Sequence, residues 1–377
     1  MVWEKTLFID KYILQLHFND FTVSLSDSLA ANFLIMKAKI VLICITAINA
    51  LFSSCTKSTD SDDTTEGNWI TRSSFEGVAR SEAVAFTIGN KGYIVAGYDG
   101  TKRLKDLWQF DPEYNFWQQK AELPGTARNA ATGFSIGDKG YIGTGYDGYN
   151  KLKDFWEYNA TTDEWTQKAD FGGSGRYSAV AFSIAGKGYI STGFDGNYLK
   201  DIWEFDPNDG TEGKWTQRVS MSGEKRMGAV AFVYNDKAYI CTGTYSGGTV
   251  NDFNVFDPAQ PEGQAWSMLR KISNASDDSY DDDYNIVRSK AAAFVLNNKA
   301  YICSGENGSI YKDTWEYDFA TDLWESKTPF EGATRSGASA FSINNRGFVL
   351  LGKSSTYQYE DIREFFPDQE YNEYEDQ

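Results

Sequence analysis

Short runs of alternating apolar and polar residues recur along the chain, and tight-turn signals separate them. The run Ala83 to Ile88 is followed by Gly89-Asn90, residue types that tolerate the positive φ of a two-residue hairpin turn. A second run spans 92–97, a third spans 106–110, and a fourth begins near Trp117. This pattern predicts a unit of four short antiparallel strands, which we call a to d.

The unit repeats with a period of about 48 residues. One tryptophan marks strand d of each unit, with spacings of 48, 48, 50, 51 and 58 residues: Trp69, Trp117, Trp165, Trp215, Trp266 and Trp324. One arginine opens strand a, and five of the six follow their tryptophan by 11 residues: Arg80, Arg128, Arg176, Arg226, Arg288 and Arg335. A four-stranded sheet cannot bury both faces alone, so the units are expected to stack as blades around an axis.

The strand count predicts how the ring closes. Six complete a–b–c sets are present, but no tryptophan follows the last set, which ends near Pro367. The segment that begins at Trp69 reads like the one that begins at Trp324 and precedes the first arginine. We therefore expect an all-β, six-bladed β-propeller at 68–367, in which the N-terminal strand around Trp69 completes the sixth blade and removes a free edge.

These features resemble the kelch-repeat family. The resemblance rests on the tryptophans, on the glycine that ends strand b and on the aromatic residue of strand c, and it covers residues 69 to about 366. The strand-c aromatics are Phe110, Tyr158, Phe205, Phe256, Tyr317 and Phe365. Kelch repeats usually carry two adjacent glycines at the end of strand b. Here only the second is kept: Gly97, Gly145, Gly193, Gly243, Gly305 and Gly352.

Features that differ between repeats are better candidates for function than features that all repeats share. Antiparallel order places the d–a loops and the b–c loops on one face, which in kelch proteins generally forms the ligand face. This face gathers aromatic and basic residues in blades 1 to 3, although the whole chain carries a formal charge of −17. The candidate ligand-binding residues are Arg80, Arg128, Arg176, Tyr98, Tyr146, Phe194, Tyr177 and Lys151.

The arginines have two interpretations. They could form a ring of charge at the mouth of the channel, where guanidinium forks and aromatic planes suit a sugar carboxylate or an acidic peptide. Alternatively, each could tie a loop to its neighbour through backbone hydrogen bonds. The acidic insert at 273–285 is equally open, since it could be a lid over the basic mouth, a calcium site or a plain disordered loop.

Histidine and cysteine usage limits the chemistry. The one histidine, His17, lies outside the repeats, so the repeats lack the usual general base and metal ligand. This argues against copper oxidases and triad hydrolases, and we expect no metal and no cofactor. Cys241 and Cys303 occupy equivalent places in adjacent repeats, and such strands lie too far apart for a disulfide, which predicts buried free thiols. The acidic charge argues against a nucleic-acid partner.

The N-terminal region is typical of a targeting sequence. A basic stretch at 36–39, an apolar run at 40–52 and the small residues before Cys55 follow the order of a secretory signal. A cysteine in this place resembles a bacterial lipoprotein signal, in which the cysteine carries the lipid. We expect an upstream segment at 1–35 that is either outside the true start or a real extension, a signal peptide at 36–54, a polar tether at 55–67 and an acidic tail at 368–377.

Two functions remain open. One is a monomeric, lipid-anchored binding module of the cell envelope that recognises a glycan or a protein. The other is a carbohydrate-active enzyme, because kelch-type sialic acid mutarotases need only acid–base groups around an open sugar ring. A carboxylate inside the channel mouth would favour the enzyme.

Overall fold

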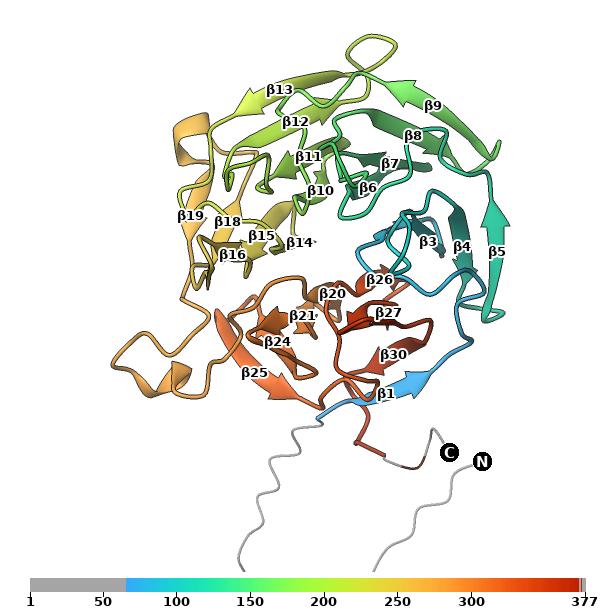
Figure 1. The fold of residues 1–377 in the computed structure, drawn as a ribbon. Helices are drawn as coiled ribbons and strands as arrows, with labels where there is room; N and C mark the ends of the chain where they lie inside the picture. Colours follow the sequence, from blue (N-terminus) through green and yellow to red (C-terminus); the bar gives the residue numbers. More distant parts are fainter. Residues whose placement is uncertain (1–65, 373, 375–377) are drawn as a thin grey trace, which may run out of the picture. The chain divides into compact units, whose positions relative to one another are not determined.

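The computed structural model describes residues 66–372 and 374 of the 377-residue chain. Within this part, regular structure is β-strand apart from two 3₁₀ segments, η1 (Glu262–Gln264) and η2 (Ser279–Asp281). The main strands form six four-stranded antiparallel sheets, arranged as blades around a central axis (Figure 1). The prediction of a six-bladed propeller is confirmed. No helix in the described part is long and apolar enough to cross a bilayer.

Blades 1 to 3 each consist of four consecutive strands. Blade 1 contains β2 (Val84–Ile88), β3 (Lys91–Val95), β4 (Leu107–Asp111) and β5 (Phe116–Lys120). Blade 2 contains β6 (Thr132–Ile136), β7 (Lys139–Gly143), β8 (Phe155–Asn159) and β9 (Glu164–Lys168). Blade 3 contains β10 (Val180–Ile184), β11 (Lys187–Ser191), β12 (Ile202–Asp206) and β13 (Lys214–Arg218).

Blades 4 to 6 each add a short hairpin in the b–c loop. Blade 4 contains β14 (Val230–Tyr234), β15 (Lys237–Cys241), β18 (Asn254–Phe256) and β19 (Trp266–Met268), with the hairpin β16 (Thr244–Tyr245) and β17 (Gly248–Thr249). Blade 5 contains β20 (Ala292–Leu296), β21 (Lys299–Cys303), β24 (Thr314–Asp318) and β25 (Leu323–Lys327), with β22 (Glu306–Asn307) and β23 (Ser309–Ile310). Blade 6 contains β26 (Ser339–Ile343), β27 (Arg346–Leu350), β30 (Ile362–Phe366) and β1 (Asn68–Thr71), with β28 (Lys353–Ser354) and β29 (Tyr357–Gln358).

The a–b hairpins follow from turn chemistry and from alternation. In blade 6, Asn344 and Asn345 have φ of 50° and 59°, the left-handed conformation that a type I′ turn needs at both central positions. In β2, residues alternate between buried and partly exposed, because successive side chains of a strand point to opposite faces of the sheet. Phe86 pairs with Tyr93 across this hairpin, and their rings stack at 5.4 Å.

Aromatic side chains fill the spaces between blades. Phe134 of blade 2 packs against strand b of blade 3, where a Cβ added to Gly188 would lie 2.0 Å from the phenyl ring. Glycine at this position therefore lets the neighbouring ring approach the backbone. Cys241 and Cys303 are buried free thiols, as predicted.

The axis is lined by small side chains of the innermost strands. One layer consists of Ala83, Ala131, Ala179, Ala229, Ala291 and Ala338, and a second consists of Ala85, Gly133, Ala181, Ala231, Ala293 and Ala340. The two cavities along this axis measure about 190 and about 110 Å³. These cavities are smaller than a typical ligand pocket, so a ligand site is expected on a face of the ring.

The N-terminal strand closes the ring, as predicted. β1 pairs with β30 in antiparallel register, and Trp69 lies opposite Phe365. The Trp69 side chain is fully buried and packs against the rings of Phe294, Phe330 and Phe365. Its Nε1 donates a hydrogen bond of 3.2 Å to the backbone oxygen of Thr328 in blade 5. One side chain thus joins blade 6 to blade 5.

Replacing Trp69 should destabilise the whole fold. Trp69→Ala removes a buried aromatic side chain at the closure, so we expect a loss of about 3–5 kcal/mol in the free energy of unfolding, measured by urea denaturation. Phe116→Ala, an exposed site on strand d of blade 1, is the control and should change stability by about 0.5 kcal/mol or less. Equal losses for the two variants would contradict the closing role of β1.

Candidate functional site

The d–a and b–c loops meet on one face of the propeller. In every blade, the residue after the repeated arginine forms an isolated β-bridge with the residue after the strand-b glycine. Tyr98 pairs in this way with Ser81, Tyr146 with Asn129, and Phe194 with Tyr177. We call this side of the ring the loop face. Its construction explains why the predicted aromatic residues lie near one another.

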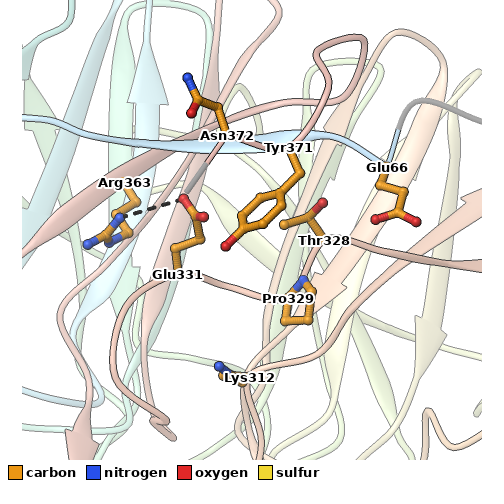
Figure 2. Close-up of a pocket in the computed structure, with 8 residues that line it drawn as sticks. All are labelled: Glu66, Lys312, Thr328, Pro329, Glu331, Arg363, Tyr371 and Asn372. Atoms are coloured by element: carbon orange, nitrogen blue, oxygen red, sulfur yellow. Dashed lines mark ion pairs between the residues drawn. The ribbon is translucent and has the colours of Figure 1, made fainter. Parts of the chain in front are cut away.

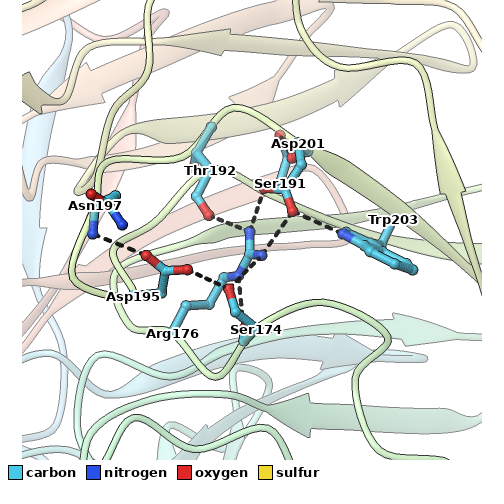
Figure 3. Close-up of polar contacts among 8 residues, drawn as sticks. All are labelled: Ser174, Arg176, Ser191, Thr192, Asp195, Asn197, Asp201 and Trp203. Carbon is cyan, nitrogen blue, oxygen red and sulfur yellow. Dashed lines mark hydrogen bonds and ion pairs between the residues drawn. The ribbon is translucent and has the colours of Figure 1, made fainter.

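Beneath the loop face, the arginine of each repeat forms the same kind of buried unit. In blade 3, Arg176 Nη1 donates to the backbone oxygen of Thr192 at 2.9 Å, and both terminal nitrogens bind the Asp201 carboxylate at 2.6 and 2.8 Å. The same carboxylate accepts a 2.9 Å hydrogen bond from Trp203 Nε1 (Figure 3). All six arginines are 0–1 % exposed, and each has an aspartate partner: Asp106, Asp154, Asp201, Asp252, Asp313 and Asp361.

The arginine unit explains the missing first glycine of the kelch pattern. The residue that stands in its place has a φ of 60–63° in all six blades: Ala96, Thr144, Thr192, Thr242, Ser304 and Leu351. The carbonyl of each accepts the hydrogen bond from the arginine Nη1. The left-handed conformation costs an L-residue roughly 1–2 kcal/mol. The blades therefore keep the backbone shape that glycine favours, and the guanidinium holds it.

The units also connect neighbouring blades. The strand-b glycine of each blade donates its N–H to the backbone oxygen of the next blade's arginine, at 2.6–2.9 Å. The series returns to its start, since Gly352 of blade 6 donates to Arg80 of blade 1. Of the two interpretations of the arginines, backbone tethering is the one that the structure shows.

This burial corrects the predicted ligand-binding set. Arg80, Arg128 and Arg176 have no exposed surface with which to clamp a ligand, because aspartates and backbone oxygens surround their guanidinium groups. The prediction that they form a charged ring at the mouth is wrong. Sequence reasoning had a signal for the correct answer, since an aspartate recurs 25 or 26 residues after every arginine.

Ion pairing lowers the pKa of two of these aspartates. Burial alone would raise the pKa of Asp106 and Asp154, but the hydrogen bonds and positive charges of Arg80 and Arg128 outweigh it, and the net pKa lies below the ordinary 3.8. A depressed carboxyl pKa stabilises the folded state at pH values above the unfolded pKa. That contribution is lost as the pH falls through 3.8 toward the lower folded-state value.

Removing one aspartate tests the arginine unit. Asp154→Ala leaves the Arg128 guanidinium buried without its counter-ion, so we expect a loss of about 3–5 kcal/mol at pH 7. The variant should also lose less stability than the wild type on acidification below about pH 4. Asp170→Ala breaks an exposed pair with Lys153 in the same blade and should cost about 1 kcal/mol or less. Urea denaturation at several pH values measures the stability of the wild type and of both variants. Similar losses for the two variants would contradict a stabilising role of the arginine–aspartate unit.

A closed ring of backbone hydrogen bonds forms the mouth of the axis. The second residue after each arginine donates its N–H to the carbonyl of the equivalent residue in the preceding blade, at 2.8–2.9 Å. We call these residues the mouth ring: Glu82, Ala130, Ser178, Gly228, Lys290 and Gly337, all with φ between 50° and 65°. Glu82 and Lys290 are its charged members.

A charged cluster lies at this mouth. Lys290 Nζ is 3.4 Å from Glu82 Oε1 and 3.1 Å from Glu306 Oε1. Burial would lower the pKa of Lys290, but the two carboxylates raise it above its ordinary value, so the ammonium stays charged at neutral pH. Burial likewise raises the pKa of Glu306, and Lys290 and its other neighbours reverse this to a net lowering. The sequence analysis did not predict this cluster. A signal was present, because the second position after the arginine holds a small residue in four blades but Glu82 or Lys290 in the other two.

An arc of aromatic rings follows the loop face from blade 1 to blade 4. Successive ring centroids lie 5.2–5.7 Å apart from Tyr146 to Tyr245, and the Arg103 guanidinium links Tyr98 to Tyr146. We call this the aromatic arc: Tyr98, Tyr146, Tyr177, Phe194, Tyr198 and Tyr245. Four of its members were predicted as site residues. Lys151, also predicted, is exposed and forms a backbone bridge with Tyr146.

The hydroxyl groups of the arc differ in availability. Tyr98 and Tyr146 donate to the backbone oxygens of Gly100 and Gly148 within their own loops. In contrast, the hydroxyls of Tyr177 and Tyr198 donate no hydrogen bond to any residue in the described part of the chain. Burial raises the pKa of Tyr177, and Tyr146 and Glu82 add to this shift. These two phenols are therefore hydrogen-bond donors open to a ligand.

A polar groove adjoins the cluster. It lies between the hairpins of blades 4 and 5 and measures about 360 Å³. Hydroxyl, amide and backbone groups line it, together with the Glu306 carboxylate: Thr244, Gly247, Gly248, Thr249, Ser289, Glu306, Asn307, Gly308, Ser309 and Ile310. Aromatic arc, charged cluster and polar groove together form the candidate site.

The acidic insert does not belong to this site. Ser273 and Asn285 close it with a β-bridge, and the Asp281 carboxylate accepts two 3.0 Å bonds from the backbone N–H groups of Ala275 and Ser276. The buried Tyr284 accepts a 2.7 Å hydrogen bond from the Trp324 backbone. The segment projects from the outer edge of the ring near β25 (Figure 1). The lid and disordered-loop interpretations are wrong, and no metal-binding group of acidic, cysteine or histidine residues exists among the described residues.

A separate cavity lies at the closure between blades 5 and 6. It measures about 490 Å³ and is lined by Glu66, Lys312, Thr328, Pro329, Glu331, Arg363, Tyr371 and Asn372. Tyr371 projects into it, with the Glu331–Arg363 pair on one side and Glu66 on the other (Figure 2). None of its residues belongs to the aromatic arc or to the charged cluster.

Comparisons with known proteins agree with this architecture. The KLHDC2/KLHL20/DRC7 kelch-repeats domain matches residues 173–352, and the kelch motif matches residues 79–124. The chain belongs to the kelch-repeat β-propeller family. A solved structure, "Structure of YjhT", aligns with a TM-score of 0.62 at 17% identity, covering 76% of this chain and 95% of that one. A search of curated proteins found no match.

This kelch propeller departs from its family's glycine pattern without losing the fold. The YjhT likeness, at 17% identity, supports the shared fold alone. What the candidate site binds must therefore be inferred from the residues of this chain.

Proposed function

We propose that this kelch propeller is a binding module that recognises a glycan on its loop face. The aromatic arc is the observation that carries the proposal. Apart from the exposed Tyr245, its rings are half-buried and braced by their neighbours, so little side-chain entropy remains to be lost when a ligand packs against them. Sugar rings offer apolar faces to aromatic planes and hydroxyl groups to polar neighbours.

The polar groups around the arc support a hydroxyl-rich ligand. The free phenols of Tyr177 and Tyr198 offer donors beside the rings. The groove between blades 4 and 5 adds the hydroxyls of Thr244, Ser289 and Ser309. A protein ligand usually meets a larger apolar centre than this mixture provides. The loop face is also the surface that kelch proteins generally use for ligands.

Substitution in the arc tests the proposal. Tyr177→Ala should weaken glycan binding about tenfold, since it removes a central ring, whereas Tyr177→Phe should lose only the hydroxyl contribution. Tyr114→Ala, an exposed tyrosine outside the loop face, is the control and should bind like the wild type. A glycan array identifies the ligand, and calorimetry measures the affinities. Wild-type binding by all three variants, or capture of a protein instead of a glycan, counts against the proposal.

A sugar mutarotase is a second candidate, and the carboxylates of the charged cluster favour it. The kelch repeats resemble those of kelch-type sialic acid mutarotases, which suggests the reaction. Such a reaction needs a base that takes the proton from the anomeric hydroxyl and an acid that returns one to the ring oxygen. The carboxylates of Glu82 and Glu306 could serve as bases, and the protonated Lys290 as the acid.

Anomer exchange of sialic acid, followed by proton NMR, decides this candidate. A mutarotase should accelerate exchange by about 10² or more over buffer, and the double variant Glu82→Gln, Glu306→Gln should abolish the acceleration. Exchange at the buffer rate with wild-type protein rejects the candidate and leaves the binding proposal standing.

We also propose that the propeller is displayed at the cell envelope through a lipid on Cys55, as a monomer. Cys55 and the preceding signal lie outside the described residues, so the sequence pattern is the support. Cys55→Ser should release the protein from the membrane fraction. An unchanged distribution in cell fractionation would speak against the anchor.

A further inference from the structure

Arg103 differs from the buried arginines in its surroundings. It belongs to the b–c loop of blade 1, where its backbone bridges to Tyr98. Its guanidinium lies over two rings from different blades, 5.2 Å from the Tyr98 centroid and 5.0 Å from the Tyr146 centroid. Aromatic faces of this kind attract a cation and hold its plane in one orientation.

A hydrogen-bond chain fixes the same group from within the plane. Arg103 Nε donates to Asn129 Oδ1 at 2.8 Å. Asn129 in turn donates through Nδ2 to Glu82 of the mouth ring. The loop of blade 2 also approaches closely, since a Cβ added to Gly148 would lie 2.7 Å from Arg103 Nη1. The guanidinium is therefore held in place before any ligand binds.

The terminal nitrogens of Arg103 remain available. Within residues 66–372, neither Nη1 nor Nη2 has a hydrogen-bond acceptor or a carboxylate within ion-pair distance. Asp147 is a nearby carboxylate, but its Oδ1 accepts the backbone N–H groups of Tyr149 and Asn150 at 2.7 and 2.6 Å. In the six buried units, by contrast, an aspartate fills the guanidinium fork.

The charge around Arg103 favours an anion. The exposed Lys102 precedes it, and the exposed Lys151 stands at the equivalent position of blade 2. A fixed guanidinium fork binds planar or tetrahedral oxyanions through two parallel hydrogen bonds, and prior ordering reduces the entropy lost on binding.

We propose that Arg103 is a specificity residue that binds an oxyanion, a carboxylate or a sulfate ester, carried by the glycan on the aromatic arc. This inference rests on the proposed glycan-binding function. Anion recognition is thereby assigned to an arginine that a ligand can reach, instead of to the buried Arg80, Arg128 and Arg176.

The first experiment compares acidic and neutral glycans. Wild-type protein, Arg103→Lys and Lys214→Gln, an exposed lysine on strand d of blade 3, are applied to an array that holds neutral, uronate-bearing and sulfated glycans. We expect wild-type binding to acidic glycans, at least a tenfold loss for Arg103→Lys, which keeps the charge but not the fork, and little change for Lys214→Gln. The uronate and sulfate arms show which oxyanion is recognised.

A second measurement separates the two proposals. In protein labelled with ¹⁵N-arginine, the Arg103 Nε–H resonance should shift saturably on addition of acetate or sulfate, but not of chloride. Binding of neutral glycans that is insensitive to Arg103→Lys overturns the inference and leaves the glycan proposal intact. If no glycan binds, the glycan proposal fails. The anion site then stands only if the resonance shifts saturably, and an unmoved resonance overturns it.

Discussion

Each blade of this propeller depends on a buried guanidinium group that satisfies three sets of acceptors at once. The arginine binds an aspartate of strand c, the carbonyl at the end of strand b and a carbonyl of its own d–a loop, as Arg128 does with Asp154, Thr144 and Thr126. A charge without exposed surface is tolerated only when it is paired and fully hydrogen-bonded. The cost of separating these partners keeps the loops of each blade in one arrangement.

The same units determine what the loop face can offer a ligand. Their backbone oxygens receive N–H groups from neighbouring blades, and the mouth ring closes directly after them. Because these contacts are identical in every blade, they leave selectivity to the residues that vary: the aromatic arc, the charged cluster and Arg103. A ligand therefore meets a rigid surface whose chemistry changes from blade to blade.

The scaffold could be predicted from the sequence, because each repeat could be compared with the other five. The match between the Trp69 and Trp324 segments was enough to assign the closing strand. Burial of the arginines was harder to predict, since arginine at a loop is usually exposed and the partner aspartate lies 25 or 26 residues away. The contacts of Arg103 with Tyr146 and Asn129 join two blades, and no spacing within one repeat encodes them. The position of the acidic insert could not be predicted either, because it depends on the contact of Tyr284 with the distant Trp324.

The central claim is that the six repeated arginines belong to the scaffold and that Arg103 belongs to the site. Reaction of the native protein with phenylglyoxal, followed by peptide mass spectrometry, measures arginine accessibility directly. The account predicts rapid modification of Arg103 and protection of Arg80, Arg128, Arg176, Arg226, Arg288 and Arg335 until the protein unfolds. Modification of Arg128 or Arg176 in the folded protein at the rate of Arg103 would contradict it.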